Sequence, residues 1–171
     1  MFPKVYKLII SFLIIGFSIY QFTENYIGNG IFYLLLSAIF ILIYFKNELI
    51  FIAFLRLRKQ DFQGTLKWLN RIKNPEKNLI KKQQGYFHYL HGIILSQTNL
   101  TQAEKHFKKA LNFGLSMSTD IAMAKMSLAG ILMQKRRKRE AVNLLNEAKK
   151  LDKHGMLTQQ IKTLQQQLKK I

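Results

Sequence analysis

Two histidines three positions apart could bring two metal-ligating nitrogens to one side of a helix. His88 and His91 have this spacing, and residues three apart are neighbours on a helix surface. The carboxylate nearest to them in the sequence is Glu76, and the chain has no cysteine. Because structural metal sites usually take four ligands, the pair predicts two ordinary helix-surface histidines. No metal and no other cofactor is expected.

Other catalytic groups are equally scarce. The sequence offers no Ser/His/Asp arrangement, no glycine-rich loop that could cradle a phosphate, and only seven acids over residues 51–171. Paired carboxylates or a base next to a nucleophile are the usual means of general acid–base and covalent catalysis. We therefore expect that the protein is not an enzyme.

Charge and aromatic residues divide the chain into two unlike parts. Residues 1–50 carry three basic and two acidic side chains, whereas residues 51–171 carry 24 basic and seven acidic ones, a net charge of +17. Of the 21 aromatic residues, 14 precede residue 56. The sequence thus predicts an apolar front part joined to a strongly basic, polar back part.

The front part contains two apolar runs, Leu8–Phe22 and Ile31–Phe45. Each is shorter than the roughly 20 residues that cross a bilayer, but flanking apolar residues could lengthen both. We expect a two-helix transmembrane hairpin over residues 1–48, with spans at about 5–22 and 31–48. A cleaved secretory signal is the alternative for the first run, although no convincing small-x-small cleavage site follows it before Glu24.

The flanking charges predict an orientation for this hairpin. The connector 23–30 has no Lys or Arg, whereas bases stand before the first run and after the second. By the positive-inside rule, both termini and everything after the hairpin would lie in the cytoplasm. The expected location is the inner membrane of a bacterium, as an integral membrane protein.

The back part repeats itself with a period of 38 residues. Leu90–Leu95 returns as Leu128–Met133, and a small-and-apolar set returns in the same register. That set is Ala103, Phe107 and Ala110, and the equivalent residues 38 positions later are Ala141, Leu145 and Ala148. A fixed period of this size is typical of stacked helix pairs. We expect an all-α solenoid of antiparallel helix pairs over 49–155, with units at about 49–84, 85–119 and 120–155, closed by an amphipathic capping helix over 156–171.

Local signals suggest where the helices of the second and third units begin and end. Thr101 and Glu104 have the spacing of a capping box that opens a helix, and Gly114 is placed to end it. Asp120 could cap the following helix.

This pattern resembles the tetratricopeptide repeat. Leu90, Ala103, Phe107 and Ala110 match the family's small and aromatic positions, as do Leu128, Ala129, Ala141 and Ala148 in the next unit. The period of 38 rather than 34, the late glycines Gly92 and Gly130 and the missing closing proline depart from it. The resemblance implies a helical solenoid that binds proteins or peptides on its concave side.

The resemblance also implies which residues line that side. Met123, Met126, Gly130 and Met133 lie at i, i+3, i+7 and i+10, so they form a stripe along one face of a helix in the third unit. This stripe and its counterparts one unit earlier give the expected partner-binding residues, which are His88, Gly92, Leu95, Met123, Met126, Gly130 and Met133. Methionine suits adaptable contacts and glycine allows close approach of a backbone. Alternatively, the methionines pack beneath the final amphipathic helix.

Two basic clusters offer further contacts. Lys135, Arg136, Arg137, Lys138 and Arg139 form an unbroken run between two helices, which either contacts an acidic partner or is only a solvated loop. If residues 31–59 form one helix, the opposite edge of the stack lies near lipid. The lysines expected to meet anionic headgroups there are Lys73, Lys77, Lys81 and Lys82.

Taken together, these features predict a membrane-anchored adaptor or scaffold that binds a protein or peptide partner at the cytoplasmic face. The alternative is a basic electrostatic module that binds anionic lipid or nucleic acid next to the membrane. Nucleic acid is the weaker partner, because no aromatic residues are interleaved with the basic run.

Overall fold

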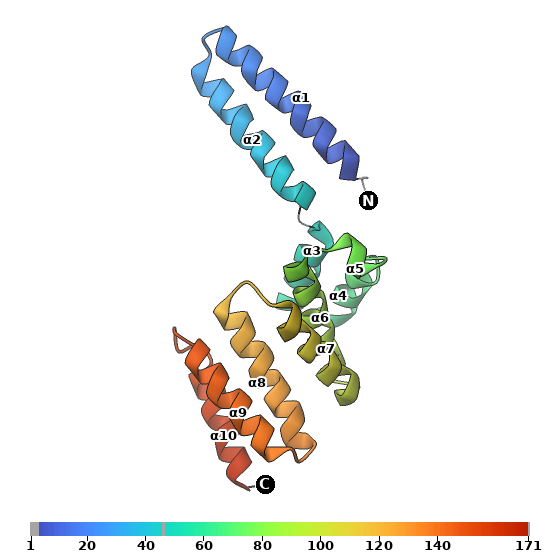
Figure 1. Cartoon of the computed structure of the whole chain (residues 1–171), viewed down its shortest axis with the longest axis vertical. Coiled ribbons are helices and arrows are strands. Elements are labelled where there is room, and N and C mark those ends of the chain that lie inside the picture. Colours follow the sequence, from blue (N-terminus) through green and yellow to red (C-terminus); the bar gives the residue numbers. More distant parts are fainter. Residues whose placement is uncertain (1–3, 46, 171) are drawn as a thin grey trace. The chain divides into compact units, whose positions relative to one another are not determined.

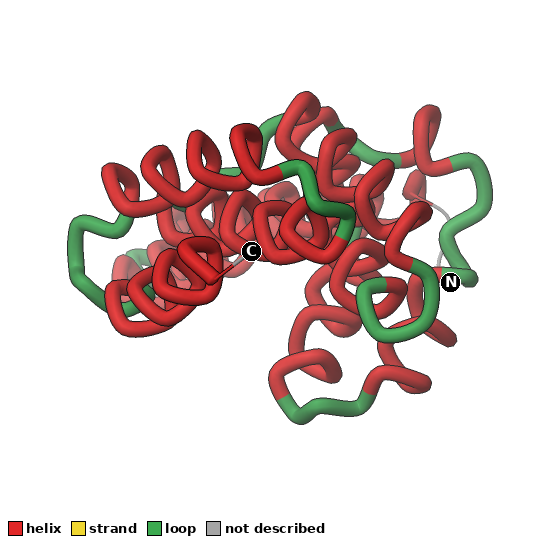
Figure 2. The backbone as a smooth tube through the Cα atoms, turned by 90° about the horizontal axis from the view of Figure 1, so that it is seen from below, coloured by secondary structure: helices red, strands yellow, loops and turns green. Residues whose placement is uncertain are grey.

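The computed structural model describes residues 4–45 and 47–170. Residues 1–3, 46 and 171, which belong to the expected hairpin and capping segments, lie outside this description. Within the described residues, helices are joined by loops and no strand occurs (Figure 2). The all-α class expected from the sequence is confirmed. The chain divides into two compact units, Met1–Glu48 and Leu49–Ile171, each with its own packing.

The first unit is a hairpin of α1 (Lys4–Thr23) and α2 (Ile27–Phe45) (Figure 1). Small polar residues line the contact between the two helices. The hydroxyl of Ser18 donates to the carbonyl of Gly30 at 2.7 Å, and that of Ser11 donates to the carbonyl of Ser37 at 3.3 Å. These bonds satisfy buried hydroxyls at the line of contact. On the other faces many large apolar side chains are exposed.

No helix in the described part of the chain combines the length and the apolar character needed to cross a membrane. The expected transmembrane hairpin is therefore wrong, and so are the integral-membrane location and the orientation derived from it. The helices have 20 and 19 residues, but each apolar run covers only 15 of them, fewer than the roughly 20 apolar residues of a typical span. The added positions include Lys4, Lys7 and Thr23 in α1 and Gly28, Asn29 and Gly30 in α2. The single helix over 31–59, from which the lipid-facing edge of the stack was derived, does not form either, because α2 ends at Phe45 and α3 begins at Glu48.

The second unit is built from the helices that follow (Figure 1). Their bounds are α3 (Glu48–Arg58), α4 (Phe62–Leu69), α5 (Pro75–Asn78), α6 (Lys81–Leu95), α7 (Leu100–Phe113), α8 (Ser118–Gln134), α9 (Lys138–Leu151) and α10 (Thr158–Lys170). Helices α6 and α7 pack against each other, as do α8 and α9, and α10 contacts both α8 and α9. Neighbours in the sequence are thus neighbours in space.

Two apolar clusters hold this unit together. The first joins α3 and α4 to α6 and is centred on Ala53, Leu69 and Leu90. The second runs from α6 to α10, and Phe107 and Leu145 are among its fully buried side chains. Helix α6 contributes to both clusters because it is apolar over a wide arc. The repeated alanines of α7 and α9 are all fully buried, and they are Ala103, Ala110, Ala141 and Ala148.

The helix ends differ in part from the sequence expectations. Helix α7 begins two residues earlier than the capping box predicted, since the side chain of Asn99 accepts from the backbone N–H of Gln102 at 3.0 Å. Asp120 lies inside α8 and accepts from the hydroxyl of Tyr86 at 2.5 Å instead of capping that helix. Gly114 ends α7 at φ +86, as expected from its type.

One glycine sits where a side chain does not fit. A Cβ on Gly85 would lie 2.2 Å from the carbonyl oxygen of Gly114. We expect Gly85→Ala to lower the free energy of unfolding by about 1–3 kcal/mol, because α6 and the end of α7 must move apart. Gly130 of α8 is the matched control, since nothing lies within 4 Å of its added Cβ.

In Gly130→Ala we expect a gain of about 0.5–1 kcal/mol from the lower backbone entropy of alanine. Urea unfolding followed by circular dichroism measures both changes. Equal effects of the two substitutions would contradict the close packing at Gly85.

Candidate functional site

The methionine stripe on α8 lies largely inside the protein. Met133 is buried and Met126 is half-buried against the second apolar cluster, which also contains side chains of α10. Met123 is 39 % exposed, and its sulfur accepts from the hydroxyl of Tyr89 at 3.9 Å. Gly130 is half-buried. Of the expected α8 contact residues, only Met123 is well exposed to a partner.

The corresponding residues of α6 face α7 rather than an open groove. Gly92 is buried, and a Cβ there would lie 3.1 Å from the ring of Phe107. Leu95 is half-buried against the second cluster. His88 packs against His106 of α7. The structure therefore gives these three residues a role in the packing between α6 and α7.

Three histidines gather at that packing surface. The Nδ1 atoms of His88 and His106 are 3.1 Å apart, which fits a hydrogen bond with one ring donating and the other accepting. The ring of His91 lies 5.1 Å from that of His106, and His88 stacks on Phe113. No set of three or more His, Cys, Asp or Glu side chains within residues 4–45 and 47–170 is arranged to hold a metal ion.

The environment of this histidine cluster disfavours positive charge. Burial lowers the pKa of His88 to about 4, and the nearby His106, Lys109 and His91 lower it further. Burial and His106 likewise lower the pKa of His91 to about 4. The pKa of His106 is lowered by burial and by Lys109. At neutral pH all three rings are therefore uncharged.

The basic run is partly held by an acid from the preceding helix pair. The carboxylate of Glu104 on α7 accepts from Lys135 and from Arg137 at 2.7 Å each, and from Lys108 at 2.6 Å. Burial raises the pKa of Glu104, but the bonds from these three bases outweigh it and bring the pKa down to about 2. Arg137 also pairs with Glu140. Lys135 and Arg137 thus fasten the turn before α9 to α7.

The rest of the basic run points to solvent. Arg136, Lys138 and Arg139 are exposed, and within the described residues none of them forms an ion pair with a carboxylate. Arg136 has a left-handed backbone, with φ +59. The turn therefore presents three free cations on a backbone that two other cations hold in place.

The lysines expected near lipid all lie on the surface. Lys73 precedes α5, Lys77 belongs to it, and Lys81 and Lys82 open α6. All four are exposed, and they make no ion pair within the part of the chain that the structure describes. Two cations in the first turn of α6 are unfavourable for the helix dipole, so these charges do not stabilise the helix end.

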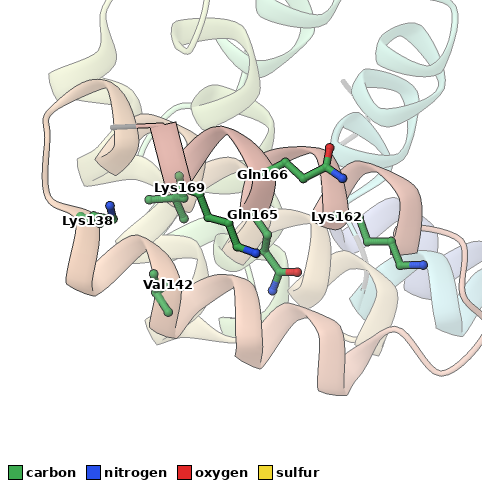
Figure 3. Close-up of a pocket in the computed structure, with 7 residues that line it drawn as sticks. Lys138, Val142, Lys162, Gln165, Gln166 and Lys169 are labelled. Atoms are coloured by element: carbon green, nitrogen blue, oxygen red, sulfur yellow. The ribbon is translucent and has the colours of Figure 1, made fainter.

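A cleft that the sequence analysis missed lies between α9 and α10 (Figure 3). Its volume is about 660 Å³. It is lined by Lys138, Val142, Lys162, Gln165, Gln166, Leu168 and Lys169. Val142 is 38 % exposed, whereas Leu168 is buried. The cleft therefore combines two aliphatic side chains with three lysine ammonium groups, of which that of Lys138 belongs to the basic run.

No family model matches this chain, and no curated protein or solved structure matches it either. The tetratricopeptide-repeat resemblance with an N-terminal transmembrane hairpin is corrected accordingly. The hairpin helices are not membrane spans, and the methionine and glycine positions that the resemblance assigned to a concave face are mostly packed.

Proposed function

We propose that the helices of residues 49–171 form a scaffold that binds an acidic segment of another protein. The observation that carries this proposal is the imbalance of exposed charge. Residues 51–171 have 24 basic and seven acidic side chains, and most of the acids are occupied within the unit. Glu104, Glu140, Glu147 and Asp61 pair with bases, and Asp120 and Asp152 accept hydrogen bonds.

The cations left over are numerous and exposed, so they create a positive field that attracts acidic partners. Complementary charge of this kind raises association rates and selects partners by sign. The turn before α9 is fastened by Glu104, which supports a surface that is ordered before binding. A binding site that is ordered in advance loses less entropy when a partner docks.

Binding of labelled peptides to the full chain tests the proposal. Fluorescence anisotropy with ten-residue acidic, neutral and basic peptides at 0.15 M salt should show binding of the acidic peptides alone. The affinity should fall as salt increases, because screening weakens contacts between exposed charges. A single-stranded RNA oligomer and vesicles with anionic headgroups serve as competing ligands. Tight binding of either one, without binding of acidic peptides, would favour the electrostatic alternative and reject the proposal.

A further inference from the structure

The cleft between α9 and α10 brings exposed cations and apolar surface together. Lys138 and Val142 line it from α9, and the other lining residues come from α10 (Figure 3). The described residues that line it include no carboxylate. A volume of about 660 Å³ lies within the roughly 300–1,000 Å³ of ligand-binding clefts. The cleft is thus suited to an anionic ligand with an apolar part.

The spacing of the cations predicts the spacing of the anionic groups. Lys162, Gln165 and Lys169 stand at i, i+3 and i+7 and share one face of α10. Seven helical residues rise about 10 Å, which separates the two lysines by that distance along the helix. Lys138 lies at the Lys169 end of the cleft (Figure 3). An extended chain of the polyproline II type has three residues per turn and rises about 3.1 Å per residue, so side chains three residues apart share one face and lie about 9 Å apart.

We propose that this cleft binds an extended peptide segment with two carboxylates three residues apart and an apolar side chain that rests on Val142. One carboxylate contacts Lys138 and Lys169, and the other contacts Lys162. This inference rests on the proposed binding of acidic protein segments and assigns that binding to a site.

A peptide fits this lining better than a nucleic acid or a phosphate-rich surface does. The side chain of Gln165 extends from α10 toward α9 (Figure 3), and its amide both donates and accepts. A peptide backbone offers both kinds of group, whereas a phosphate only accepts. The lining has no arginine for two-pronged phosphate contacts and no aromatic ring for base stacking.

The test uses the full chain and three fluorescein-labelled ten-residue peptides. The first carries two glutamates three positions apart with a leucine between them, the second has the same composition with adjacent glutamates, and the third has glutamines instead. We expect the first peptide to bind best. Lys162→Gln with Lys169→Gln should weaken it about tenfold, a change of the size expected when two charge-assisted contacts are lost. Val142→Glu should abolish binding, because it fills the cleft with a repelling carboxylate.

The matched control is Lys73→Gln with Lys77→Gln, which removes the same charge from two exposed positions outside the cleft. It should change the affinity less than about twofold at 0.15 M salt, where distant charges are largely screened. Acetylation footprinting of the unaltered chain gives a measurement that needs no variant. The first peptide should protect Lys138, Lys162 and Lys169 from acetylation and leave Lys73 and Lys77 reactive.

Different failures have different meanings. Equal weakening by both lysine pairs, or protection outside the cleft, would overturn the cleft assignment while acidic-peptide binding stands. If none of the acidic peptides binds the chain, both the cleft assignment and the proposed function fail. If the RNA oligomer or the anionic vesicles bind instead and lose affinity in the cleft variants, the cleft is an anion site of another class and the peptide proposal is rejected.

Discussion

Glu104→Ala is expected to lower the free energy of unfolding of residues 49–171 by about 3 kcal/mol. The substitution removes three charge-assisted hydrogen bonds, each worth roughly 1.5–3 kcal/mol when well shielded. The side chain of Glu104 is 8 % exposed, but Lys135 and Arg137 are 27 % and 39 % exposed, so water compensates part of the loss. Urea unfolding followed by circular dichroism measures the change.

The control for this prediction is an acid that pairs across helices at the surface. Glu147 of α9 forms an ion pair with Lys125 of α8, and its side chain is 51 % exposed. Glu147→Ala should cost less than about 1 kcal/mol, as exposed pairs usually do. Glu104→Ala should in addition weaken acidic-peptide binding, because the turn before α9 loses its attachment to α7. A cost for Glu104→Ala no larger than that for Glu147→Ala would show that the turn is not held by this carboxylate.

Acidification from pH 7 to pH 4 is expected to destabilise the same unit by on the order of 3 kcal/mol through the histidine cluster. The pKa of His88 and that of His91 are about 4 in the folded protein, against about 6.5 in an unfolded chain. The unfolded state therefore binds more protons across this window, and stability falls as the pH drops from about 6.5 to about 4. Two full shifts would give about 6 kcal/mol, which we halve because the rings are partly exposed to solvent.

The pH dependence can be separated from other titrations. In the triple variant His88→Gln, His91→Gln, His106→Gln, the free energy of unfolding should lose most of its dependence on pH between pH 6.5 and 4. His154→Gln, at an exposed position after α9, should keep it. The lowered pKa of Glu104 acts below this window, since its stabilising effect is lost as the pH falls from about 4.5 toward 2. An unchanged slope in the triple variant would remove the histidines as its cause. Thermal unfolding at each pH provides the measurement.

The helical class could be predicted from the sequence because it depends on periodicity. Small and apolar residues recur at helical spacing through Ala103, Phe107 and Ala110 and again through Ala141, Leu145 and Ala148, and all of these are buried. Gly114 likewise ends α7 as its residue type predicts. These features are local, so a single sequence is enough to read them.

The functional surface was harder to predict because it depends on which residues meet across helices. Glu104 has the spacing of a capping residue relative to Thr101, but its three bases come partly from a turn more than 30 residues away. The stripe through Met123 and Met133 was assigned to an open face, although α8 buries much of it. The spacing of Lys162, Gln165 and Lys169 was a signal available in the sequence. The sequence does not show, however, that Lys138 of α9 lines the same cleft as these residues of α10.

The order in which the helices pack has a consequence for how the second unit folds. Each helix of α6–α10 contacts mainly the next one along the chain, so few contacts require the closure of a long loop. Chains of this kind fold quickly, and their stability is approximately a sum over neighbouring pairs. Within the described residues, α10 is the last helix of this series and packs mainly against α9 and α8. Its local opening should therefore cost less free energy than global unfolding, so the α9–α10 edge can be remodelled while the rest of the unit stays folded.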